Sequence, residues 1–186
     1  MDLIKRLLPA ILLTALAFGG EPRILRPADQ SAIPKGPFTV IAKADAGAKL
    51  ELDGKPLAVT ELASGILSVT ISAPAGVHEL RLTAASGERK IRFAVGALEN
   101  YKHFRVHPPA ATCDSCHAAR NGVWEMKNAV LEKTCSGCHN LSSFAKSHTH
   151  NTEVLNECQM CHNPHGSTEA KHLVLPKITA CKQCHG

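Results

Sequence analysis

The sequence predicts two unlike halves, a small all-β sandwich followed by a mostly irregular region with short helices. Two observations predict this division. Apolar and polar residues alternate in short runs through the first half, whereas one five-residue pattern, C-x-x-C-H, occurs four times in the last 74 residues and contains all eight cysteines. The expected boundaries are residues 1–20 for a leader, 23–96 for the sandwich, 97–106 for a connector and 107–186 for the repeat region.

Residues 1–20 have the features of a secretory signal. Lys5 and Arg6 precede an apolar stretch from Leu7 to Phe18, and small residues follow as in a cleavage region. The apolar stretch is shorter than the roughly 20 residues that cross a bilayer. We therefore expect export, cleavage and no membrane span in the mature chain, with a retained anchor as the alternative.

Residues 23–96 contain short strands and no cluster of metal-binding side chains. Alternating apolar and polar residues recur, between glycine-containing turns, at 67–71, 79–83 and 90–95. Five to seven strands at this spacing indicate a small antiparallel sandwich. The one histidine of the stretch, His78, is expected to be an ordinary strand residue.

Two short segments of this half resemble bacterial immunoglobulin-like modules. They are Leu50-Glu-Leu-Asp-Gly-Lys55 and Gly76-Val-His-Glu-Leu-Arg-Leu82. The resemblance implies an immunoglobulin-like sandwich that serves as a spacer or docking module and carries no chemistry of its own.

The four repeats carry the chemistry of the second half. They read Cys113-Asp-Ser-Cys116-His117, Cys135-Ser-Gly-Cys138-His139, Cys158-Gln-Met-Cys161-His162 and Cys181-Lys-Gln-Cys184-His185. C-x-x-C-H is the pattern of c-type haem attachment, in which two thiols bond to the porphyrin and the histidine binds the iron. Four covalently attached haems are expected, on a chain with little regular structure apart from short helices and one longer helix over 122–134.

Zinc sites are the rival interpretation, because paired C-x-x-C motifs about twenty residues apart also bind zinc. The histidines decide between the two. Histidine makes up 11 of 186 residues, so four repeats in four would end in histidine by chance roughly once in 80,000. A site of four cysteines has no use for those histidines, and no cysteine is left over for a structural disulfide.

Composition limits the other functions. Aromatic residues are only 4% of the chain, so we expect the repeat region to fold only around its haems. The formal charge of +5 is offset by about −4 from the propionates and iron of four ferric haems, which leaves the holoprotein close to neutral. No run of five or six basic residues is present, so a nucleic-acid partner is not expected.

The second axial ligand of each iron separates an electron carrier from an enzyme with an open site. Outside the repeats, six histidines of the second half are candidates for four positions. The expected ligands are His107, one of His148 and His150, His165 and His172, with His103 in reserve. For the second repeat, Met126 is an alternative, which would raise the potential of that haem.

A second resemblance covers about 30 residues closely. The block Cys158-Gln-Met-Cys-His-Asn-Pro-His-Gly-Ser167, with Leu173-Val-Leu175 and the fourth repeat, resembles the doubled C-x-x-C-H multihaem cytochromes. The resemblance implies bis-histidine haems packed in a chain, with His165 as the ligand of the Pro-His-Gly block. In the first pair of repeats Ala118-Ala-Arg-Asn-Gly122 replaces that block, so the ligands of the first two haems stay open.

These observations predict an exported tetrahaem c-type cytochrome that carries electrons in the periplasm or outside the cell and is not an enzyme. Its expected partners are redox proteins or extracellular acceptors. Two alternatives remain. One is a subunit of a polymeric multihaem filament, in which a surplus histidine of one copy binds a haem of the next. The other is an oxidoreductase with one open haem.

Overall fold

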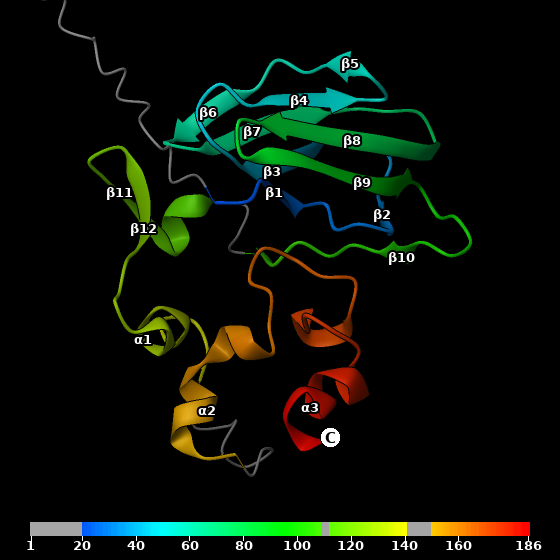
Figure 1. The fold of residues 1–186 in the computed structure, drawn as a ribbon. Helices are drawn as coiled ribbons and strands as arrows, with labels where there is room; N and C mark the ends of the chain where they lie inside the picture. The colour runs from blue at the N-terminus through cyan, green and yellow to red at the C-terminus, as the bar shows by residue number, and fades with distance from the viewer. Residues whose placement is uncertain (1–19, 109–111, 141–149) are drawn as a thin grey trace, which may run out of the picture.

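The structure is a computed structural model that describes residues 20–108, 112–140 and 150–186 (Figure 1). Nearly all of the predicted signal sequence and the candidate ligand His148 lie outside the described residues. The first half of the described chain is a two-layered β-sandwich, and the second half lies beside the edge that holds β1 (Arg23–Arg26), β2 (Ser31–Ile33) and β10 (Lys102–His103), as short helices, turns and one hairpin.

The sandwich has the strand order of an immunoglobulin-type fold. One sheet has the order β1 (Arg23–Arg26), β3 (Phe38–Lys43), β7 (Ile66–Ile71) and β6 (Thr60–Ala63). The other has the order β10 (Lys102–His103), β2 (Ser31–Ile33), β9 (Gly87–Val95), β8 (Gly76–Ala84), β4 (Lys49–Leu52) and β5 (Lys55–Pro56). Neighbouring strands are antiparallel, except that β2 runs parallel to β9 and β10. The predicted all-β sandwich is confirmed.

The predicted alternation places the core between the sheets. Leu80 and Leu82 of β8 and Phe93 of β9 are fully buried, while the residues between them face outward. Val40 of β3 meets them from the opposite sheet. Because successive side chains of a strand point to opposite faces, the alternating residues of β8 bury one face of that strand. Burying each of these side chains stabilises the fold by about 1.5–3 kcal/mol.

His78 is the exception on the inward face of β8, and both of its ring nitrogens are bonded. Nδ1 lies 2.7 Å from Oδ2 of Asp53, and Nε2 lies 2.8 Å from the carbonyl of Pro74. Both partners are acceptors, so the ring satisfies both only when it is protonated and donates twice. His78 is therefore a structural residue whose nitrogens are not free to bind a metal.

This pair predicts a pH dependence of stability. Burial lowers the pKa of His78, but the hydrogen bonds to Asp53 and Pro74 outweigh it and raise the pKa above the usual 6.5. The resulting stabilisation is complete below about pH 6.5 and is lost as the pH rises through the raised pKa of the folded state. For the carboxyl of Asp53, burial acts in the opposite direction and raises the pKa. The hydrogen bonds from His78 and from the backbone N–H of Glu79 outweigh burial, so the pKa of Asp53 is lowered overall. Its contribution is present above about pH 4 and is lost as the pH falls further.

We therefore expect the free energy of unfolding to fall by about 0.5–1 kcal/mol between about pH 6 and about pH 8.5, a modest change because Asp53 is half exposed. Denaturant titrations followed by far-ultraviolet circular dichroism measure this. Asp53→Asn is the matched control, because asparagine keeps the positive φ of this turn position and an acceptor for Glu79. Equal pH slopes for the wild type and this variant would contradict the assignment.

Part of the expected connector at 97–106, residues 102–104, belongs to the sandwich. Lys102 and His103 form β10 beside β2, and the next residue, Phe104, is only 2% exposed. Its ring meets Phe38 edge-on at a centroid distance of 6.2 Å, and its N–H donates to the carbonyl of Ala32. Burial of the Phe104 ring in the core explains this difference, because it holds the adjacent residues Lys102 and His103 beside β2.

The second half contains short elements. They are η2 (Cys113–Ser115), β11 (His117–Arg120), β12 (Val123–Met126), α1 (Leu131–Cys135), α2 (Thr152–Asn156), η4 (Cys158–Met160), η5 (Ala170–His172) and α3 (Lys177–His185). The predicted helix over 122–134 is wrong for its first half, because β12 pairs with β11 in a hairpin. Asn121 and Gly122 both have positive φ, as an Asn-Gly hairpin turn requires.

In the described parts of the chain, no helix is both long and apolar enough to cross a membrane.

Candidate functional site

Each C-x-x-C-H repeat begins in a helical turn. In the second and third repeats, the histidine N–H donates to the carbonyl of the first cysteine at 2.9 Å, and the fourth repeat lies within α3. The first repeat begins in η2, and its histidine then starts β11. Residues three and four positions apart share one face of a helix. In the last three repeats, this local structure therefore places the two thiols and the imidazole on the same side of the chain.

Three repeat histidines lie opposite a histidine from outside the repeats. The planes of the His117 and His165 rings are nearly parallel, with 6.3 Å between their centroids and 7° between the planes. His139 faces His107 at 5.9 Å and 35°. His185 faces His150 at 5.8 Å and 29°, with 3.5 Å between the two Nε2 atoms. Each pair joins residues that are distant in the sequence.

These spacings fit two imidazoles on opposite sides of one iron. Imidazole nitrogen binds first-row metals at about 2.0 Å, so two axial rings have centroids about 6 Å apart. A porphyrin fills the remaining four positions of the iron, so only two protein donors are needed. Within the described residues, no three His, Cys, Asp or Glu side chains converge as they would around zinc. The eight cysteines are free thiols.

The third repeat differs from the others. Among the described residues, no histidine ring is paired with His162. Its Nδ1 lies 2.8 Å from the carbonyl of Lys171, and an N–H donated there leaves Nε2 free for a metal. The nearby His172 has a buried Nδ1 without a hydrogen-bond partner in the described chain and contacts His107 edge-on at 5.3 Å.

Burial favours the neutral form of two of the paired histidines, His165 and His107, by lowering the pKa of each. It lowers the pKa of His165, and the charges of His117 and Arg26 lower it further. Burial, with the neighbouring His172 and His139, likewise lowers the pKa of His107. A neutral imidazole has the free lone pair that coordination requires.

The thiols of the first three repeats lie near one another. Burial raises the pKa of Cys135 to about 11, and the neighbouring thiols of Cys158 and Cys116 add to the effect. Cys135 therefore remains a thiol at neutral pH. Attachment points that lie this close would place their cofactors side by side.

The remaining candidate residues are placed as follows. His103 is exposed on β10 and forms no ring pair with a repeat histidine among the described residues. Met126 lies directly across the hairpin from His117, whereas the second repeat has His107 opposite its histidine. Sequence reasoning missed the contact of Trp124 with His117, whose rings meet edge-on at 6.1 Å. The Asn121-Gly122 turn was the signal that could have predicted this hairpin.

The sandwich holds the segment that carries His165 (Figure 1). Arg105 and Ser167 exchange two backbone hydrogen bonds of 3.0 Å, and Arg105 Nη2 also donates to the carbonyl of Thr168. Between these residues and His165 lies Gly166, whose backbone rests against the buried ring of Phe104. The position of the His165 ring therefore depends on the packing of the sandwich.

Comparison with known proteins supports a haem site. The family model for the doubled CXXCH motif matches residues 148–186, which contain the third and fourth repeats. This match covers about a fifth of the chain and implies covalently bound c-type haem there. No curated protein matches the chain.

Solved titin domains are similar to part of the chain. The M4 domain in its trigonal form is 21% identical, with 41% of this chain and 95% of that chain covered and a TM-score of 0.29. The M3 domain is 15% identical, with 40% and 93% covered and a TM-score of 0.28. The immunoglobulin-like assignment rests on the strand order of the sandwich rather than on these similarities.

Proposed function

We propose that this chain is an exported tetrahaem c-type cytochrome that carries electrons along closely spaced bis-histidine haems. The observation that carries the proposal is the near-parallel pair of rings of His117 and His165. One ring belongs to a haem-attachment repeat, the other lies 48 positions later in the sequence, and their spacing is that of two axial ligands. The doubled motif in residues 148–186 supports the cofactor class.

The ring pairs suggest the ligands of three haems. The first haem takes His117 and His165, the second His139 and His107, and the fourth His185 and His150. The third takes His162, oriented by Lys171. Its second ligand would come from His172 or from His148, which lies outside the described residues.

In this proposal the chain itself performs no bond chemistry. Haem, when bound, supplies the one-electron oxidation and reduction. The histidines fix the orientation of each site and close it to exogenous ligands, and burial of side chains such as His165 limits the access of water. The leader at 1–20 and the site of c-type haem attachment favour the periplasm or the cell exterior, where redox proteins or extracellular acceptors would be the partners.

The third repeat favours a second candidate function. A haem on His162 without a protein ligand on its other side would bind small molecules, which would make the chain an oxidoreductase with one open site. The filament alternative depends on a surplus histidine such as the exposed His103, and electron microscopy of the holoprotein tests it. Monodisperse particles with every iron bound within one chain would exclude the filament.

The haem count and the response to carbon monoxide test the proposal directly. The protein is produced in a host that attaches c-type haem, and a pyridine haemochrome assay counts the haems. Visible spectra of the reduced protein are recorded before and after carbon monoxide is added. We expect four haems and no spectral change, because every iron would have two protein ligands. A shifted Soret band would favour the open site, and the absence of haem in a competent host would overturn both functions.

A further inference from the structure

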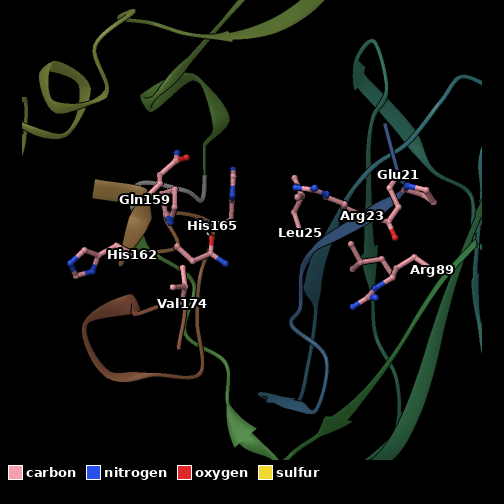
Figure 2. Close-up of a pocket in the computed structure, with 12 residues that line it drawn as sticks. Glu21, Arg23, Leu25, Arg89, Gln159, His162, His165 and Val174 are labelled. Carbon is pink, nitrogen blue, oxygen red and sulfur yellow. Dashed lines mark hydrogen bonds between the residues drawn. The ribbon is translucent and has the colours of Figure 1, made fainter. Parts of the chain in front are cut away.

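A cleft of about 560 Å³ lies between the edge of the sandwich and the segment that follows the third repeat. Arg23 and Leu25 of β1 and Arg89 of β9 line it from the sandwich, and His162 and His165 line the other side. Figure 2 shows Arg23 and Leu25 reaching across toward the segment that carries His165, whereas the ring of His162 is turned away from the sandwich.

The sandwich side of this cleft is cationic. Arg23 and Arg89 are exposed and form no ion pair within the described residues. Among the residues that line the cleft, Glu21 is the one carboxylate. The position of Arg89 follows from the strand, since residue 89 lies on the same face of β9 as the buried Ile91 and Phe93. Arginine at this end of the sheet therefore points toward the cleft rather than toward the outer face.

A third arginine extends this charge toward the first repeat. Arg26 is the last residue of β1 and is only 7% exposed. Its charge interacts with Cys113, the first cysteine of the first repeat, and with His165, the ring opposite His117. The cationic edge of the sandwich thus lies near His165, the ring that faces His117 of the first repeat.

We propose that Arg23 and Arg89 bind the propionate carboxylates of the haem held by His117 and His165, so that the sandwich forms one wall of that haem site. The inference rests on the proposed function. Arginine presents a planar fork of N–H donors that matches a carboxylate with two parallel hydrogen bonds. The immunoglobulin-like module is then not a spacer, because it sets the electrostatic environment of one haem.

The charge of these arginines predicts a change in reduction potential. The oxidised site carries one more positive charge than the reduced site, so a nearby guanidinium disfavours oxidation. Removing that charge stabilises the oxidised state and lowers the potential of this haem. Without their partners, the propionates also protonate at higher pH, so the potential of the haem becomes pH-dependent nearer neutrality.

The test uses the full-length holoprotein with Arg23→Gln and Arg89→Gln, singly and together. Arg92→Gln is the matched control, because Arg92 lies on the same strand, is exposed and faces the opposite side of β9. Haem count, carbon monoxide response and potentiometric titrations over a range of pH are measured for each preparation. His165→Ala identifies which of the titrating components belongs to the first haem.

We expect the double variant to keep four haems, to remain insensitive to carbon monoxide and to lower the potential of that one component. The potentials of the other three components should stay the same, and Arg92→Gln should leave all four potentials unchanged. Unchanged potentials and unchanged pH dependence in a protein with four haems would overturn the propionate assignment and leave the electron-carrier function intact. The assignment would also fail if Arg92→Gln lowered the potential of the same haem equally. It would fail too if the potentials of the wild type and the double variant differed only in the presence of inorganic phosphate. Fewer than four haems in the unmodified protein would contradict the proposed function itself.

Discussion

Replacing His165 with alanine should convert one of four haems to the high-spin state while all four stay attached. Covalent attachment depends on the cysteines, which this change leaves intact, whereas the axial position opposite His117 loses the ring whose centroid lies 6.3 Å away. The expected signature is a high-spin electron paramagnetic resonance signal from about one quarter of the iron, together with a new response of the reduced protein to carbon monoxide.

The control for this experiment is His103→Ala. His103 was the reserve candidate for an axial ligand, but it is exposed on β10 and forms no ring pair with a repeat histidine among the described residues. The His103→Ala variant should keep a low-spin spectrum that does not change when carbon monoxide is added. If His165→Ala also leaves the spectrum unchanged with four haems bound, His165 is not a ligand, and the pairing with His117 is a packing contact.

Replacing Gly166 with alanine should strongly destabilise the contact between the sandwich and the segment that carries His165. A Cβ at this position would lie 2.5 Å from Cζ of Phe104 and 2.8 Å from the backbone oxygen of Arg105, and φ is +131°. Both neighbours are fixed, since Phe104 is buried in the core and Arg105 is hydrogen-bonded to Ser167. We expect a loss of about 2–4 kcal/mol from steric overlap and backbone strain together.

Gly76→Ala separates the two causes. Gly76 has a similar φ of +142°, but a Cβ there would meet nothing within 4 Å. It should therefore show only the strain, about 1 kcal/mol. Denaturant midpoints of the holoproteins measure both variants, and spectroscopy of Gly166→Ala should also show a disturbed site at the adjacent His165. Equal losses of stability in the two variants would mean that the backbone around Gly166 relaxes to accommodate the methyl group and does not fix the position of His165.

The C-x-x-C-H repeats could be recognised without a structure, because the chemistry of haem attachment would fix residue type and spacing over five consecutive positions. The sandwich could be predicted for a similar reason. A period of two in hydrophobicity, as at Leu80 and Leu82, is a local property that directly reflects which face of a strand is buried. His78 was expected to be an ordinary strand residue. It lies in β8, but its hydrogen bonds to Asp53 and Pro74 could not be foreseen.

The partners of the repeat histidines were decided only by the tertiary structure. His107 precedes the first repeat but faces His139 of the second, and the first repeat receives His165 from 48 positions further along. Sequence proximity carries no information about such pairs, because the intervening chain is irregular and its course depends on packing. The same holds for residues 97–106, which were expected to be a connector. Phe104 joins the sandwich core and there supports the backbone of Gly166, so two segments some 60 residues apart are joined by one buried ring.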